Sequence, residues 1–219
     1  MWKLGVVSIF VWGAYACSSD ETEEVSPEPV APAQSYPLAF EKIIIDDDAQ
    51  GPAFSTITDI NGDGKLDILV TKFGVVRLPD LPLGQVTAYL QGETLNDWTA
   101  TPIFDQSAGI YWPNDVDMHD IDGDGDLDAL VGSGFLACEF VPSVGPCGNL
   151  SWFEQTGSSW KQHTIVPTGS ELFYHAAVLT DLDGDGFDDL ITVGERRPSS
   201  DSGEPDRAEI QWFKGNNTE

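Results

Sequence analysis

The sequence predicts an all-β fold built from about three copies of a repeat of about 61 residues. A nine-residue acidic loop occurs three times, and its first aspartates, Asp59, Asp120 and Asp181, are 61 residues apart in both intervals. Short apolar runs flank every copy, and no segment has the 3.6-residue periodicity of an amphipathic helix. Self-similarity at a fixed period is the signature of a repeat architecture.

Each repeat contains up to four strand-like runs. The first precedes the acidic loop, at residues 54–58, 116–119 and 176–180. The second follows it, at residues 68–70, 129–131 and 190–192, and an aromatic third lies at 88–90, 150–153 and 210–213. The fourth occupies 98–104 and 160–166. Four short strands per repeat predict the four-stranded blades of a β-propeller.

The two ends of the repeat region differ from its middle. The third repeat has no fourth run, whereas an apolar run of that kind, residues 40–45, precedes the first repeat. We expect this run to form a strand that completes the last blade. Three blades are fewer than the four to eight that are typical. Three arrangements stay open: an unusual three-bladed closure, a two-chain six-bladed assembly, and a fragment of a longer protein.

The N-terminal region predicts export. Residues 1–16 have a short basic start and a 13-residue uncharged run, Leu4–Ala16, which is too short to span a bilayer. Cleavage before Cys17 suits either the ordinary signal peptidase or a bacterial lipoprotein with lipid on Cys17. Residues 17–38 are acidic and proline-rich and predict a tether, and 39–219 the propeller domain. The protein is thus expected at the bacterial outer membrane or cell surface, or otherwise periplasmic or secreted.

Charge and cysteine content narrow the chemistry. The net charge of −27 argues against a nucleic-acid partner, which would require basic patches. Cys138 and Cys147 bracket a short loop with proline and glycine, and in an exported protein they are most simply a disulfide. Two free thiols are the alternative. The absence of a nearby histidine disfavours zinc.

The acidic loops predict about three Ca²⁺ ions. Each has Asp or Asn at positions 1, 3, 5 and 9, and calcium takes such oxygen ligands together with a backbone carbonyl at position 7. The predicted ligand residues are Asp59, Asn61, Asp63, Lys65 and Asp67; Asp120, Asp122, Asp124, Asp126 and Asp128; and Asp181, Asp183, Asp185, Phe187 and Asp189.

These loops are not EF-hands. Position 12 is Val70, Val131 or Thr192 instead of a bidentate glutamate, so the aspartate at position 9 is the expected closing ligand. An Asp/Gly-rich turn without metal is the alternative, but it would leave the repulsion among the carboxylates uncompensated. With Asn61 at position 3, the first loop has one carboxylate fewer and should bind calcium most weakly.

The pattern Asp-x-Asp-Gly-Asp-Gly-x-Leu-Asp, followed by an apolar strand and later Trp-Phe, resembles the FG-GAP/VCBS repeat. The resemblance covers about residues 39–214. That family is related to the integrin α-subunit propeller and is common in bacterial surface proteins. The Gly-Ala-Pro of FG-GAP is missing here, so the chain is closer to the bacterial VCBS type. The resemblance implies structural calcium and a binding platform, and it implies no enzymatic activity.

Two hypotheses about function follow. The first is a surface-tethered, calcium-binding propeller that binds a protein or glycan on the loop face opposite calcium, as an adhesion module. The second is the propeller part of an exported carbohydrate-active enzyme, such as a polysaccharide lyase, with its active site in loops or missing sequence.

Trp112 and Phe173 either bind ligand on the loop face opposite calcium or fill gaps between blades. The three histidines are scattered and no catalytic motif is present, so no catalytic residue is assigned and the binding module is favoured. The only membrane contact expected is through the lipid anchor, and self-association could complete the propeller.

Overall fold

A computed structural model describes residues 39–77, 79–135, 137, 141, 145–196 and 203–216. The chain divides into two compact units, Met1–Glu41 and Lys42–Glu219, and the second contains all the strands below. The predicted signal segment and tether, with Cys17, lie outside the described residues, as does Cys138. No helix among the described residues is long and apolar enough to cross a membrane.

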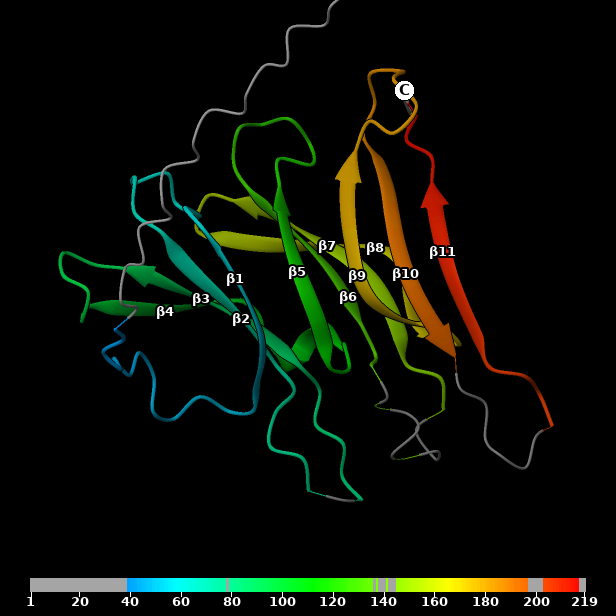
Figure 1. Cartoon of the computed structure of the whole chain (residues 1–219), viewed down its shortest axis with the longest axis horizontal. Helices are drawn as coiled ribbons and strands as arrows, with labels where there is room; N and C mark the ends of the chain where they lie inside the picture. The colour runs from blue at the N-terminus through cyan, green and yellow to red at the C-terminus, as the bar shows by residue number, and fades with distance from the viewer. Residues whose placement is uncertain are drawn as a thin grey trace, which may run out of the picture. The chain divides into compact units, whose positions relative to one another are not determined.

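The described residues form eleven strands in three antiparallel sheets (Figure 1). The first sheet has the order β1 (Pro52–Thr58), β2 (Asp67–Lys72), β3 (Gln85–Gln91) and β4 (Trp98–Phe104), followed by the short 3₁₀ helix η1 (Gln106–Ala108). The second has the order β5 (Pro113–His119), β6 (Asp128–Ser133), β7 (Gly148–Thr156) and β8 (Ser159–Ser170). The third contains β9 (Phe173–Thr180), β10 (Asp189–Arg196) and β11 (Arg207–Phe213).

These sheets confirm the predicted all-β fold of propeller-type blades. In each sheet, strands that are consecutive in sequence are neighbours, so each repeat folds as one meander. The third sheet has three strands, in agreement with the missing fourth run of the third repeat. In β6, Ala129 and Val131 pack in the core shared with the first sheet and Leu130 in the core shared with the third, the alternation expected of a strand.

The predicted strand at residues 40–45 is wrong for this structure. This segment belongs to no sheet, and Phe40 and Ile44 are 88% and 62% exposed. The chain that follows is held at the first sheet instead, because the Tyr89 hydroxyl of β3 donates a 2.5 Å hydrogen bond to Asp46. A strand forms only where another strand edge meets its backbone groups, and residues 40–45 have no such partner here.

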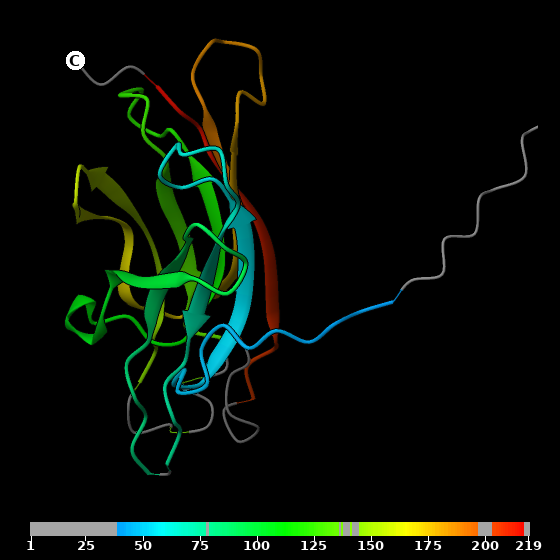
Figure 2. The ribbon, with the colours of Figure 1, turned by 90° about the vertical axis from the view of Figure 1, so that its left-hand side faces the viewer.

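The core lies between successive sheets. The cluster between the first and second sheets is centred on Phe104 and Phe153, whose rings stack with centroids 4.3 Å apart. A second cluster joins the second and third sheets around Leu130, Leu150 and Tyr174. Strand β5 packs on β1 and β2, and β9 packs on β5 and β6, so the blades follow one another in chain order. Figure 2 views them from the first-sheet side.

Candidate metal centre

Each acidic loop is the hairpin between the first two strands of its sheet. The pairs Thr58–Asp67, His119–Asp128 and Thr180–Asp189 close the three hairpins. The glycines at positions 4 and 6 have positive φ, for example 79° at Gly123 and 99° at Gly125. Residues with a Cβ rarely adopt this backbone, so the Gly-x-Gly spacing is what allows the turn.

The aspartate at position 1 folds the loop around its own carboxylate. Its Oδ2 accepts the backbone N–H of the position-6 glycine at 2.8, 3.1 and 2.9 Å in the first, second and third loops. The position-5 carboxylate in turn accepts the N–H of position 7 at 2.9, 2.9 and 3.0 Å. Because these bonds recur in all three copies, the loops share one conformation that turns acidic side chains towards one another.

The aspartate at position 9 has a structural role that the sequence does not reveal. Asp67, Asp128 and Asp189 are all buried. Each uses Oδ2 to accept the N–H of position 2, at 3.0, 2.9 and 3.2 Å. Each uses Oδ1 to accept an N–H within two residues of the end of the third strand, at 2.8, 2.8 and 2.7 Å. This carboxylate therefore ties the loop to the third strand in every blade.

Burial raises the pKa of Asp128, the position-9 carboxyl group of the second loop. Removal from water raises the pKa of Asp128, and the N–H groups of Gln155 and Ile121 only partly oppose this. The neighbouring charges of Asp122 and Asp124 raise it further. A cation beside these groups would favour the ionised form and reverse that contribution.

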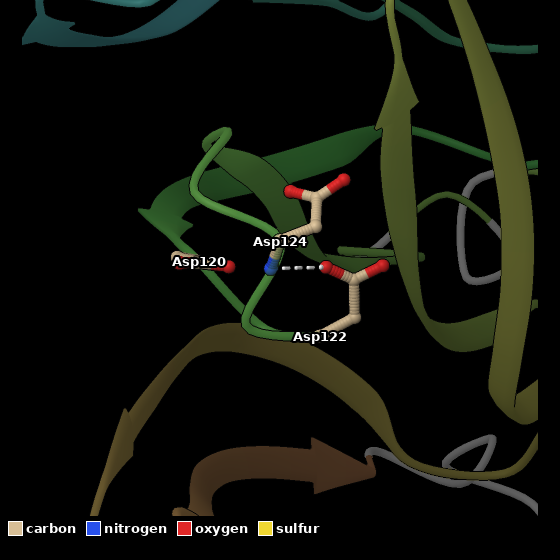
Figure 3. Close-up of side chains that lie close together, drawn as sticks. All are labelled: Asp120, Asp122 and Asp124. Atoms are coloured by element: carbon tan, nitrogen blue, oxygen red, sulfur yellow. Dashed lines mark hydrogen bonds between the residues drawn. The ribbon is translucent and has the colours of Figure 1, made fainter.

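Carboxylates converge in two of the three loops. Asp120, Asp122 and Asp124 each place one oxygen within 4.8 Å of the others, and Figure 3 shows them around one turn, with the Asp124 N–H donating to Asp122. In the third loop, the group differs in its third member, since Asp181 and Asp183 at positions 1 and 3 are joined by Asp189 at position 9. Of the described residues, those of the first loop form no such group of three, in line with Asn61 at its third position.

Lysines of the chain itself approach two of the loops. The Lys214 ammonium contacts Asp183 and, at 2.8 Å, Asp185 in the third loop. These contacts raise the pKa of Lys214 and, with the Phe187 N–H, lower that of Asp185. In the first loop, Lys65 lies 3.8 Å from Asp63. No ion pair among the described residues reaches the second loop, so its charge has no internal compensation.

The position-7 residues differ in their side chains, as expected for a position that offers only its carbonyl. Lys65 extends to Asp63 and to Glu93, and Phe187 is exposed. The neighbouring Asp188, which replaces the leucine of the other copies, pairs with His119 of β5 at 2.9 Å. This substitution thus links the third loop to the second sheet and does not disrupt the blade.

The remaining candidates do not assemble into a catalytic group. The three histidines pair with three separate carboxylates: His119 with Asp188, His163 with Glu154 and His175 with Glu195. Trp112 is buried and stacks on Phe73 with centroids 5.0 Å apart, and Phe173 is also buried. Both aromatic residues therefore fill space between structural elements, as one of the two interpretations predicted.

Blades with an aspartate-rich hairpin between their first two strands define this chain as a protein of propeller-type repeats. Residues 59–131 match the family model of the FG-GAP-like repeat. The match runs from the first acidic loop through the second loop into β6, and it confirms the predicted FG-GAP/VCBS-type repeat there. The comparison with curated proteins found no match.

Proposed function

We propose that this chain is an exported, surface-tethered, calcium-binding β-propeller module that binds a protein or a glycan. The observation that carries the calcium part is the group formed by Asp120, Asp122 and Asp124. Three carboxylates lie within 4.8 Å, and no cationic side chain of the described residues compensates them. Closely spaced oxygen ligands with no nitrogen or sulfur among them suit a hard dication such as Ca²⁺.

In this proposal, calcium stabilises the blade and takes no part in a reaction. The second loop offers the carboxylates at positions 1, 3 and 5 and the carbonyl of Asp126. The Asp128 carboxylate already joins the loop to the end of β7. Binding of a cation would remove the repulsion in the loop and so stabilise the hairpin against unfolding.

The variant Asp122→Asn tests this proposal sharply. An amide oxygen can still accept the Asp124 N–H, as Asn61 does for Asp63 in the first loop at 3.0 Å, so only the charge is removed. We expect calorimetric titration of chelator-stripped protein to show calcium binding, weakened at the second site at least about tenfold by the variant, or ~1.4 kcal/mol. Asp105→Asn, at the N-cap of η1 outside the loops, removes the same charge and keeps an oxygen for the Ser107 N–H, so it is the matched control. If calcium produces no heat and no rise in melting temperature, the proposal fails.

The ligand would bind at the opposite ends of the sheets. In Figure 1, the second strand of each sheet runs from its acidic hairpin to the opposite end of the sheet, where the third strand begins. Arg196, at the end of β10, and Arg207, at the start of β11, lie at this end. They are two of only ten basic residues in a chain of net charge −27. Loops on a rigid scaffold are common positions for recognition.

A panel of neutral and anionic polysaccharides distinguishes the two functional hypotheses. A binding module retains a polysaccharide without changing its length, and Arg207→Ala weakens retention while Lys65→Ala, at the other end, does not. A lyase or hydrolase instead shortens the chain, which gel filtration of the polysaccharide detects. Shortening would refute the binding module and favour the enzyme alternative.

Export and tethering rest on the sequence of residues 1–38 alone. We expect cells fed a fatty-acid analogue to label the wild-type protein and not Cys17→Ser. Label on the variant, or none on the wild type, would refute lipidation and leave a periplasmic or secreted protein.

A further inference from the structure

The outer edge of β11 is unlike that of the equivalent strands in the other two sheets. Strands β3 and β7 are largely buried and pair on both sides, whereas β11 pairs only with β10 among the described residues. Its Ile210 is 82% exposed, and Trp212 is half exposed. An exposed edge with apolar side chains is a template for pairing with another strand.

The buried position-9 aspartates give the register in which a further strand would pair. Their Oδ1 atoms accept the N–H groups of Gln91, Gln155 and Gly215, so these three residues are structurally equivalent. In the complete sheets, Trp98 pairs with Gln91 and Trp160 with Gln155. A fourth strand added to the third sheet should therefore place an aromatic residue opposite Gly215.

Residues 40–45, Phe-Glu-Lys-Ile-Ile-Ile, fit this position. Phe40 precedes the first loop by 19 residues (Asp59), much as Trp98 and Trp160 precede the next loops by 22 (Asp120) and 21 (Asp181). The three isoleucines of the segment are exposed and belong to no strand. The segment is therefore free to pair, and its sequence is that of a fourth strand.

Charge supports the same register. In the second sheet, Lys161 of β8 is opposite Glu154 of β7, and the two form a 2.9 Å ion pair. The equivalent positions in the third sheet would be Glu41 and Lys214, a pair of opposite charges with the signs exchanged. Cross-strand pairs of opposite charge favour pairing. Two positions further along, the same register brings Ile43 opposite Trp212.

The connection rule of the fold indicates that the strand comes from another copy. In this chain, β4 completes the first sheet and leads into β5, which packs back on that sheet, and β8 and β9 repeat the arrangement. Residues 40–45 lead into β1, so they should complete a sheet on which β1 packs. Within one copy, β1 packs on β5 of the second sheet, and the third sheet packs on the other side of the second sheet. The hydrogen bond from Tyr89 to Asp46 also holds the end of the segment at the first sheet. The sheet that residues 40–45 complete should therefore belong to another copy.

We propose that two copies of this chain assemble head to tail, with residues 40–45 of each copy pairing with β11 of the other. The first sheet of each copy then packs on the third sheet of its partner. This covers exposed apolar residues on both faces, including Phe54 and Ile57 of β1 and Val178 of β9. The reciprocal exchange gives six four-stranded sheets, a number within the usual propeller range.

Sedimentation of the purified chain tests the assembly, with Ile44→Pro as the main variant. Proline removes a backbone donor and interrupts strand pairing. Residue 44 lies outside every strand described here, so each copy should keep its circular dichroism spectrum. We expect two-chain mass for the wild type and for Ile44→Val, the matched control, and single-chain mass for Ile44→Pro. A single-chain wild type at tens of micromolar, an open-ended series of masses, or a two-chain Ile44→Pro overturns the proposal.

Disulfide trapping tests the register independently. In a Cys17→Ser background, one tagged chain carries Ile43→Cys and a second, differently tagged chain carries Trp212→Cys. We expect a covalent product that contains both tags when the two chains are mixed and oxidised. Equal yield from Asp47→Cys, just outside the pairing segment, in place of Ile43→Cys would overturn the register.

Discussion

The middle and third sheets are formed by two copies of the same repeat, yet their strands differ in burial. All six residues of β6 are buried, and β7 is buried along most of its length, whereas β11 is mostly exposed. The middle sheet packs on a neighbour at each face and has a fourth strand. Among the described residues, the third sheet has one packed neighbour and three strands. Burial in such an array therefore depends on neighbouring blades more than on a blade's own sequence.

The same comparison distinguishes their acidic loops. The backbone hydrogen bonds of the second and third loops are nearly identical, but of these two loops only the third has a lysine in contact with its carboxylates. Lys214 follows the last strand, whereas the residues at the end of β7 place no ammonium on the second loop. The environment of each loop is thus set by residues far along the chain.

The largest expected effect comes from one apolar position in the two sheets. Leu150 of β7 is 0% exposed, and its equivalent in β11 is Ile210, at 82%. Leu150→Ala should lower the free energy of unfolding by about 2–5 kcal/mol, because it leaves a cavity in the core. Ile210→Ala should change it by less than about 0.5 kcal/mol. Urea unfolding of both variants in the Ile44→Pro background restricts the comparison to single chains, and equal losses would refute it.

A disulfide would add a second difference between the sheets. Cys147 is buried directly before β7, and its predicted partner Cys138 lies outside the described residues. Closing this short loop should stabilise the middle sheet by about 2.5 kcal/mol in the chain-entropy treatment. Cys138→Ser and Cys147→Ser should then each lower stability by that amount. Reductant should weaken only the protein with both cysteines, and labelling of the Cys17→Ser protein by a thiol reagent before reduction would exclude the disulfide.

Asn61→Asp should make the first loop resemble the second. The new carboxylate adds a charged ligand, so calcium affinity at this site should rise about tenfold, or ~1.4 kcal/mol. In chelator the same variant should be less stable than the wild type, because it loses the Asn61 contact with Asp63 and adds repulsion. Calorimetry and thermal unfolding measure the two effects, with Gln106→Glu as the charge control. An unchanged affinity would mean that charge count does not rank the sites.

The sequence was sufficient to predict the blades because their information is local and periodic. Strands flank each Asp/Gly loop, and the missing fourth run of the third repeat appears in the structure as a three-stranded sheet. The hydrogen bond from the Gln155 N–H to the Asp128 carboxylate was not predictable in this way, because Gln155 is far along the chain. Lys214 was missed for the same reason. Residues 40–45 have the sequence of a strand, but strand formation depends on an available edge, which a sequence pattern does not specify.

The smallest expected effect concerns a charge cluster found in the middle sheet. Lys161, and then His163, hold the pKa of Glu154 below its usual range. A lowered pKa in the folded state means that the pairing stabilises the protein above the pKa of the unfolded chain, about 4.3, and is lost as pH falls through the folded value. Glu154→Gln should therefore melt slightly below the wild type at pH 7, and the difference should shrink as pH falls through the folded pKa of Glu154. Chelator in all samples keeps calcium out of the comparison. A difference that persists undiminished below that pKa would assign the effect to packing and not to charge.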